Sequence, residues 1–88
     1  MPTLVSKRVK QVRATGVRFG GDILYVSLSD GREVALNLKQ VAWLRWLLKA
    51  TPAQRAAWSI EPRGFAIYWN ELDDGIEVCH ALGTQPIS

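Results

Sequence analysis

Apolar and polar residues alternate in two stretches, residues 23–28 (ILYVSL) and 32–38 (REVALNL), on either side of Ser29-Asp30-Gly31. Alternation with period two is typical of strands that bury one face, so the two stretches predict a hairpin. A two-residue loop at Asp30-Gly31 would set apolar residues of one strand beside polar residues of the other. We therefore predict a three-residue loop, a type I turn with Gly31 left-handed in a G1 bulge. Its cross-strand pairs are Leu28–Arg32, Val26–Val34 and Leu24–Leu36.

Residues 9–17 predict a further strand, which leads into the turn Gly20-Gly21-Asp22. Its alternation breaks near Val12, as an edge strand or a β-bulge would explain. A second hairpin is predicted from residues 58–60 and 65–69, with a type I turn at Glu61-Pro62-Arg63-Gly64 between them. We expect this hairpin to pair Ile60 with Phe65 and Trp58 with Ile67.

The spacing of apolar residues changes to that of a helix over residues 39–49. At 100° per residue, one stripe of this helix holds Val41, Leu44, Leu47 and Leu48, with Trp43 at its edge. Trp46 falls nearly opposite the stripe, and its neighbours there are Ala42, Arg45 and Lys49. A large aromatic side chain on an outer helix face resembles an interface anchor, whereas a covering segment would make it structural. The next residues, Thr51-Pro52-Ala53-Gln54, predict a capping box that starts a short helix through about Ala57.

These elements predict an α+β fold. Residues 76–78 add a short strand or extended stretch after the second hairpin. The order β-β-β-α-α-β-β favours a mostly antiparallel sheet with two short helices packed on one face. We expect one domain over residues 9–82, a flexible basic N-terminus over residues 1–8 and a frayed tail over residues 83–88.

Composition narrows the functional class. Of the 88 residues, 48% are hydrophobic, which is typical of a chain that folds, and one core is all that this length supports. No apolar run approaches the roughly 20 residues of a membrane span, and the N-terminus lacks the apolar stretch of a signal peptide. Cys79 is the single cysteine, so no internal disulfide forms, as suits a reducing cytoplasm. We therefore expect a cytoplasmic protein.

Charge is distributed unevenly along the chain, whose net charge is +3. Residues 1–18 contain five cations and no acid, whereas residues 71–77 contain four acids and no base. A nucleic acid could be steered to the basic end through Lys7, Arg8, Lys10 and Arg13. The structural alternative is that both ends are solvated or pair with each other.

The candidate catalytic and metal-binding residues lie in the acidic loop, residues 71–77, and just after it. Carboxylates with a histidine can bind a metal or divide acid and base roles, and the candidates are Glu71, Asp73, Asp74, Glu77 and His80. Their spacing matches no stringent motif, and Asp73-Asp74-Gly75 is ordinary turn chemistry. Cys79 and His80 would point to opposite faces of an extended chain. Trp69 opens this loop and could frame a ligand cleft, although core or boundary packing is the favoured explanation. We expect no catalytic residues, no metal site and no cofactor.

Three segments together carry a family resemblance: residues 30–32 (DGR), 50–55 (ATPAQR) and 67–76 (IYWNELDDGI). In this order they resemble the small bacterial domain-of-unknown-function family numbered 2442, over residues 9–82. The resemblance implies a compact α+β fold of bacteria and their mobile elements, alone or fused to a helix-turn-helix domain. It also implies that some members are encoded beside another small protein in a toxin–antitoxin-like arrangement, and it supplies no reaction. Where the family often has proline, this chain has Asn37-Leu38, so the resemblance does not fix where the helix after the third strand begins.

These observations favour a non-enzymatic binding module that acts through protein–protein interaction, as a homodimer or as an antitoxin-like or regulatory partner. The expected contact residues are Trp46, Ala42, Arg45, Lys49, Trp69 and Asp73. One alternative is a nucleic-acid-binding protein that uses the basic N-terminal strand. The other is a small metal-binding protein or enzyme that uses residues 71–80.

Overall fold

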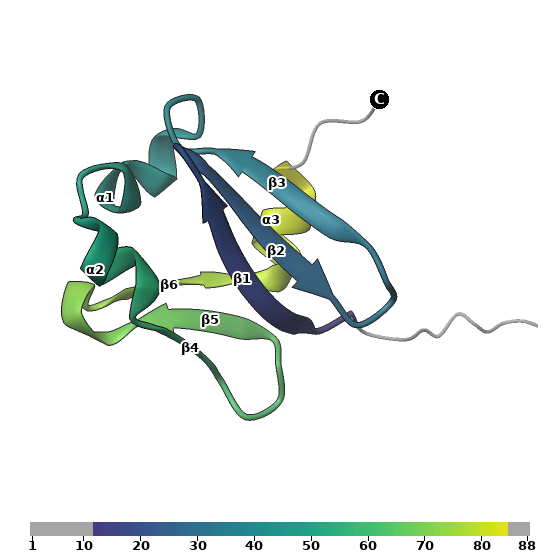
Figure 1. Cartoon of the computed structure of the whole chain (residues 1–88). Helices are drawn as coiled ribbons and strands as arrows, with labels where there is room; N and C mark the ends of the chain where they lie inside the picture. The colour runs from purple at the N-terminus through teal and green to yellow at the C-terminus, as the bar shows by residue number, and fades with distance from the viewer. Residues whose placement is uncertain (1–11, 85–88) are drawn as a thin grey trace, which may run out of the picture.

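The structure, a computed structural model, describes residues 12–84 and divides their strands between two antiparallel sheets (Figure 1). The first sheet contains β1 (Ala14–Gly20), β2 (Ile23–Leu28) and β3 (Glu33–Asn37), and the second contains β4 (Trp58–Ile60), β5 (Ala66–Trp69) and β6 (Asp74–Glu77). The helical elements are η2 (Ala42–Leu44), α1 (Arg45–Leu48), α2 (Pro52–Ala56), η3 (Asn70–Leu72) and α3 (Val78–Thr84). The predicted α+β class and element order are confirmed. The strands form two sheets rather than one.

The first hairpin has the predicted register. Leu24 lies opposite Leu36 and Val26 opposite Val34, and the Leu28 amide donates to the carbonyl of Arg32 at 2.9 Å. Gly31 has φ of 91°, so it occupies the left-handed position of the three-residue loop. Packing of one apolar face thus selects the turn, as expected from the alternation alone.

Strand β1 begins later than predicted, at Ala14 rather than at residue 9. Of the earlier residues, 9–11 lie outside the described part, and Val12 and Arg13 precede the strand. The register against β2 shifts between Ala14 and Gly16, which is the expected irregularity displaced by three residues from Val12. β1 is also an edge of its sheet, so its outer side tolerates such a bulge.

One core is shared by both sheets and the helices. Its fully buried members include Leu24 and Leu36 of the first sheet, Ile67 and Trp69 of the second, and Leu44 and Leu47 between them. A chain of this size has too little apolar surface for two cores, so the sheets close on each other. Among residues 12–84, no helix is long and apolar enough to cross a membrane.

The predicted continuous helix over residues 39–49 is broken. A 3₁₀ turn ends at Leu44, and α1 follows it for one turn. Asn37 caps a turn after β3, in which its side-chain oxygen accepts the Lys39 amide and its carbonyl accepts those of Gln40 and Val41. This turn does not continue as a helix, because Val41 is extended, with φ of −102° and ψ of 101°. The predicted inward stripe is nevertheless right at Leu44 and Leu47, which are both fully buried.

Helix α2 confirms the capping box. The Thr51 hydroxyl accepts the Gln54 amide at 3.1 Å, while the Gln54 side chain accepts the Thr51 amide at 2.9 Å. Pro52 occupies the first helical turn, where its missing amide costs no hydrogen bond.

The second hairpin forms in a register two residues away from the predicted one. Ile60 pairs with Ile67, not Phe65, and Trp58 pairs with Trp69. The loop is longer because the Glu61 carboxylate accepts the amides of Arg63 and Phe65, and Gly64 takes a φ of 83°. Because of these bonds, residues 62–65 remain in the loop and the strands pair only from Ala66, whose carbonyl accepts the Glu61 amide at 2.9 Å.

The C-terminal part also differs from expectation. Strand β6 ends at Glu77, and α3 continues to Thr84, so Gly83 and Thr84 are helical rather than part of a frayed tail. Residues 1–8 and 85–88 lie outside the described residues.

Candidate functional site

Trp46, the residue expected to anchor an exposed interface, is turned into the molecule. Its ring meets the buried Trp69 ring edge to face, with centroids 5.6 Å apart, and its Nε1 donates to the Trp43 carbonyl at 2.9 Å. It is half-buried and packs against the core. The expected exposure is wrong because Trp69 of the second sheet packs against this side of α1. Ala42, Arg45 and Lys49 are exposed, without the aromatic anchor.

Trp69 cannot frame a ligand cleft, because its side chain is fully buried at 0% exposure. Its Nε1 donates to the Arg55 carbonyl at 2.9 Å, and Phe19 meets it edge to face at 6.4 Å. The expected partner contact through Trp69 is therefore wrong, and its role is in the core.

Asp73 and its acidic neighbours form a turn at the surface. Asp73 is left-handed with φ of 54°, and its amide donates to the Asn70 carbonyl at 3.2 Å. The Asp74 carboxylate accepts the Gly75 amide at 2.8 Å. All four acids of residues 71–77 are exposed. Within residues 12–84, no three His, Cys, Asp or Glu side chains come together as a metal ion would require.

Cys79 and His80 lie in the first turn of α3, so the expected extended conformation is wrong. The His80 ring stacks on Trp43, with centroids 4.1 Å apart and planes within 11°. Cys79 is exposed. The stacking places His80 against η2 and not among the carboxylates of β6.

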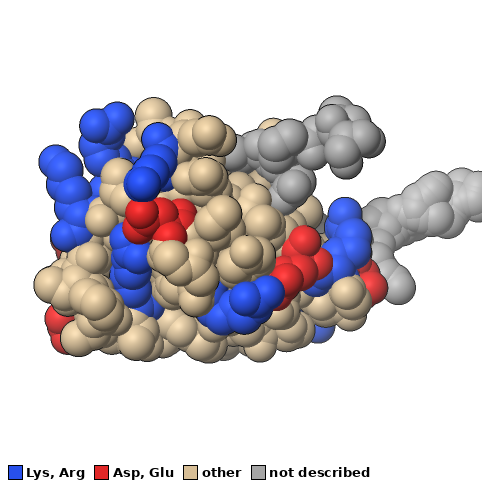
Figure 2. All heavy atoms as spheres, turned by 45° about the horizontal axis from the view of Figure 1, so that its top comes forward, with Lys and Arg blue, Asp and Glu red and all other residues tan. Residues whose placement is uncertain are grey.

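Of the basic N-terminal residues, Lys7, Arg8 and Lys10 lie outside the described residues. Arg13 is exposed; its amide donates to the Ser29 hydroxyl at 3.0 Å, and its guanidinium lies 5.7 Å from the Phe65 ring centre. From the sequence, the eight cations of residues 12–84 balance eight acids, so the excess of +3 belongs to the three earlier residues. In the face shown in Figure 2, acidic side chains on the left and toward the right lie against basic ones.

Tyr68 is the one large hydrophobic side chain exposed among residues 12–84, at 47%. It projects from the outer face of the second sheet, because neighbouring Ile67 and Trp69 point into the core. Its cross-strand partner is Gly75, and the ring lies so close that a Cβ there would meet Tyr68 Cδ1 at 2.5 Å. Gly75 thus provides the surface on which the tyrosine lies.

Hollows lie on both sides of this ring. The larger, of about 580 Å³, is lined mainly by the β4–β5 loop, β5 and the start of α3. The smaller, of about 310 Å³, lies over η3 and the turn into β6. We call them together the β5 groove, defined by Val12, Glu61, Arg63, Phe65, Ala66, Tyr68, Asn70, Asp73, Asp74, Gly75, Glu77, Val78, Cys79 and Leu82.

The two ends of the β5 groove differ in charge. At one end, the guanidinium groups of Arg13 and Arg63 each lie 5.7 Å from the centre of Phe65. At the other end, Asp73 and Asp74 line the smaller hollow. Ala66, between these ends, lines the larger hollow and is 7% exposed. The larger hollow is therefore of mixed charge, because Glu61 and Glu77 line it together with Arg63, whereas the smaller hollow is acidic.

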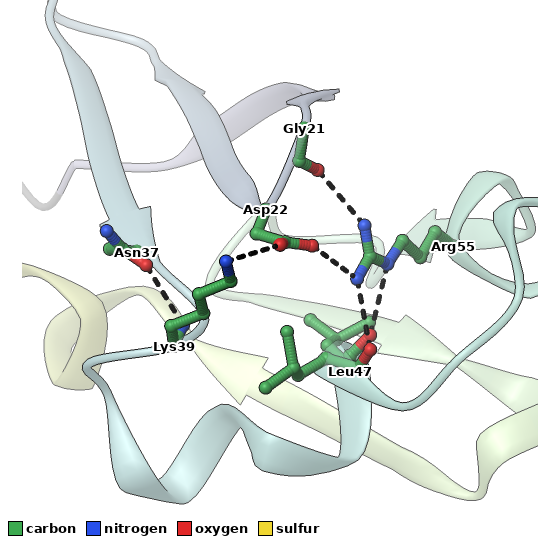
Figure 3. Close-up of polar contacts among 7 residues, drawn as sticks. Gly21, Asp22, Asn37, Lys39, Leu47 and Arg55 are labelled. Carbon is green, nitrogen blue, oxygen red and sulfur yellow. Dashed lines mark hydrogen bonds and ion pairs between the residues drawn. The ribbon is translucent and has the colours of Figure 1, made fainter.

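Arg55 connects the second sheet to the rest of the fold. Its guanidinium donates to the carbonyls of Leu47, Leu48 and Gly21 and to the Asp22 carboxylate, at 3.1 to 3.2 Å (Figure 3). Lys39 approaches the other Asp22 oxygen at 3.6 Å. Because the Arg55 carbonyl also holds Trp69, this residue fixes β5 relative to the first sheet.

The sequence carried a signal for Tyr68 that the search for motifs missed. In residues 67–69 the period of two sets Tyr68 on the face opposite Ile67 and Trp69. If Ile67 and Trp69 are both buried, Tyr68 between them is exposed unless another element covers the outer face of the strand. The helical projection favoured Trp46 instead, because the pattern of one helix does not show that Trp69 packs against it.

Comparisons with known proteins agree on the fold. The model of a family described as protein of unknown function (DUF2442) matches residues 14–78. The chain is also similar to the crystal structure, at 2.75 Å resolution, of a protein of unknown function from Rhodospirillum rubrum ATCC 11170. The TM-score is 0.71 and the identity 20%, over 90% of this chain and 94% of that one, so this likeness shows the fold alone. No curated protein matches the chain.

Proposed function

The chain belongs to the family described as protein of unknown function (DUF2442), and because that description assigns no reaction, we propose from the surface that it is a protein-interaction module. Its binding surface is the β5 groove, with Tyr68 as the anchor. This proposal keeps the class expected from the sequence and moves the contact surface from α1 to β5.

The observation that carries the proposal is the exposure of Tyr68 beside a hollow of about 580 Å³. Tyrosine is enriched at binding hot spots, because its ring gives a large contact area and its hydroxyl tolerates water in the free state. The four tryptophans are engaged in other contacts: Trp69 is buried, Trp46 packs on it, Trp43 stacks on His80, and Trp58 is half-buried against the core. Tyr68 is thus the aromatic residue that is available to a partner.

The surroundings of Tyr68 also suit a partner. Phe65 and Leu82 are half-buried in the same groove, so apolar surface continues beyond the ring. Charged groups stand at both ends, which is the arrangement of an apolar centre with a polar rim. A stable interface covers about 800 Å² on each partner, so the contact must extend beyond the groove onto this rim.

The test compares wild type, Tyr68→Ala and Tyr25→Ala. Tyr25 is a matched control, because it lies on the outer face of the first sheet under the Arg18 guanidinium, 3.9 Å from its ring centre. Mass in solution is measured over a range of concentrations, alone and after coexpression with the product of the neighbouring gene. We expect wild type to exceed the 9.8 kDa of one chain in at least one assay. Tyr68→Ala weakens that association about tenfold or more, or about 1.4 kcal/mol, and Tyr25→Ala does not.

The proposal is wrong if wild type keeps the mass of one chain in both assays, or if Tyr68→Ala associates as wild type does. Thermal unfolding of both variants shows that each is folded, since Tyr68 is exposed and contributes little to the core.

The nucleic-acid alternative stays a prediction, since Arg13 is the one member of its basic set among the described residues. Its test is a gel shift at low salt that weakens steeply as salt rises. The metal-binding alternative is not favoured by the geometry, because His80 stacks on Trp43 and not beside Asp73 or Asp74.

A further inference from the structure

We infer that residues 1–11 of this chain occupy the larger hollow of the β5 groove, so that a partner must displace them to reach Tyr68. The inference rests on the proposed function, because it takes the groove as a binding surface, and it adds how access to that surface is controlled. Two observations carry it. One is the excess of acids around Tyr68, and the other is the place of Val12 among the residues that line the hollow.

The acids that lack a cation gather around Tyr68. Among the residues that the structure describes, the acids outside the groove are each in an ion pair, and they are Asp22, Asp30 and Glu33. The others lie in or beside the groove, namely Glu61, Glu71, Asp73, Asp74 and Glu77. Of these, Glu61 alone has an ion pair within the described part, at 3.8 Å from Arg63.

The groove is therefore negatively charged as a whole. Four acids and one base, Arg63, line its two hollows within the described part of the chain. Arg13 lies beside Phe65 but lines a different hollow. An occupant of this surface must bring positive charge.

The matching cations are in the segment that precedes Val12. Residues 1–11 (MPTLVSKRVKQ) contain Lys7, Arg8 and Lys10 and no acid. These three cations account for the whole net charge of +3, because the charges of residues 12–84 balance. The segment and the groove thus have opposite charge, and their pairing needs no second molecule.

The segment is attached at the groove itself. Val12 lines the larger hollow together with Glu77 and Leu82. At about 3.3 Å per residue, Lys10 stays within about 7 Å of Val12 and Lys7 within about 17 Å, so both can reach this hollow. Attachment also gives the segment an effective concentration on the order of millimolar, so that weak contacts suffice to hold it.

Apolar residues of the segment also suit the hollow. Phe65 and Leu82 line it and are half-buried, and residues 4–9 include Leu4, Val5 and Val9. Exposed ion pairs are individually weak and are screened by salt. The segment is therefore held loosely enough for a partner to displace it.

Carbodiimide coupling tests the contact in the full chain. The reagent joins a lysine amine to a carboxylate in contact with it, and one water leaves. Lys39 and Asp22, which are 3.6 Å apart, form the positive control. Asp30 is the matched comparison, because the amide of its neighbour Ser29 donates to the Arg13 carbonyl at 2.8 Å, so Asp30 also lies near the start of the described chain.

We expect Lys7 and Lys10 to be joined to Glu61 and Glu77 about tenfold more often than to Asp30, because occupancy raises the local concentration of their amines there. The links form within one chain, so a mixture of isotope-labelled and unlabelled chains contains no hybrid peptides. At about 1 M salt the Debye length falls to about 3 Å, and the yield of these links falls with it. Mass spectrometry of the digested protein measures all three results.

The single cysteine provides a second readout, because Cys79 lines the larger hollow. An uncharged maleimide is expected to alkylate it about threefold faster in Lys7→Glu with Arg8→Glu than in wild type. Loss of nearby cations by itself slows the reaction, because cations favour the reactive thiolate, so a faster rate reports that the hollow is uncovered. The matched control is Arg45→Glu with Lys49→Glu, the same change of charge at exposed residues of α1 and its C-cap, with no change in rate expected.

Two results would overturn the inference. One is coupling of Lys7 and Lys10 to Asp30 as often as to the groove, while the link between Lys39 and Asp22 forms. The other is coupling between chains and not within them. The proposed function fails separately. Tyr68-dependent association without links to the groove removes only the inference, whereas links to the groove without any such association remove the proposed function.

Discussion

The indole nitrogen of Trp69 donates a 2.9 Å hydrogen bond to the main-chain carbonyl of Arg55, whose own guanidinium holds the first sheet and α1. A fully buried side chain of β5 is thus linked through one residue to Gly21, Asp22, Leu47 and Leu48. The position of the β5 groove therefore depends on Arg55, although Arg55 does not line it.

Arg55→Lys is expected to lower the free energy of unfolding by about 2–3 kcal/mol. Lysine keeps the charge, but its single ammonium cannot reach the three carbonyls and the Asp22 carboxylate that the planar guanidinium reaches together. The side chain is only 14% exposed, so water replaces these bonds poorly. Urea denaturation measures the difference.

The matched control is Arg18→Lys, in which an exposed arginine paired with Glu33 is changed in the same way. That surface pair is worth less than about 1 kcal/mol. Equal losses of unfolding free energy in Arg55→Lys and Arg18→Lys would show that the Arg55 contacts do not hold the sheets together.

Trp46→Ala is expected to destabilise the fold by about 3 kcal/mol, because it removes the edge-to-face contact with Trp69 and leaves a cavity. Trp46→Phe keeps an aromatic ring but loses the hydrogen bond to Trp43 and part of the indole packing, so we expect a smaller loss of stability, about 1–2 kcal/mol. Thermal and urea unfolding of both variants provide the measurement. If Trp46→Ala unfolds like wild type yet loses a partner, the structural role assigned to Trp46 is wrong.

Gly75→Ala tests whether β6 positions the ring of Tyr68, the proposed anchor. The added Cβ would meet Tyr68 Cδ1 at 2.5 Å and the Ile67 carbonyl oxygen at 2.7 Å, so both the ring and the backbone must shift. We expect a loss of about 1–3 kcal/mol and weaker association, since the tyrosine is displaced. Gly83→Ala, with open space around its Cβ and a position in α3, is the control and is expected to be neutral or slightly stabilising. A Gly75→Ala protein that matches this control in unfolding and in mass would contradict the geometry.

Asp30 leads to a prediction about how stability depends on pH. The Arg32 amide, which donates to its carboxylate at 3.0 Å, lowers the pKa of Asp30, and the Arg32 side chain adds to the effect. A lowered pKa in the folded state stabilises the fold above the ordinary aspartate pKa of about 3.9, and this contribution is lost as the pH falls through the folded value. Wild type should therefore exceed Asp30→Asn in stability at neutral pH, and the difference should shrink below about pH 4. A difference that grows on acidification would reverse the sign and refute the assignment.

Local rules predicted the parts of the fold in which a few neighbouring residues decide the outcome. Gly31 in the first hairpin and Thr51 with Gln54 at the start of α2 adopt the conformations expected of them. In each case the competing arrangement exposes an apolar face or leaves amides unsatisfied within the same few residues. No distant contact was needed to choose between them.

The second hairpin and the α1 region were mispredicted because polar side chains redirected the backbone. The Glu61 carboxylate binds two loop amides and moves the register of β4 against β5 by two residues. Asn37 accepts the amides of Lys39, Gln40 and Val41 in a turn, and the helical residues begin only after the extended Val41. Several polar residues compete for the same amides, and only the folded chain decides which of them bind.

The amino-acid sequence by itself determined the α+β class, the order of the elements and the first hairpin, because period and turn chemistry act over a few residues. Only the tertiary structure decided that the strands divide into two sheets, that Trp46 and Trp69 pack together, and that Tyr68 is left outside. The physical reason is that burial depends on which surfaces meet across the core. Which of several aromatic residues remains exposed is therefore set by packing between distant segments and not by their local pattern.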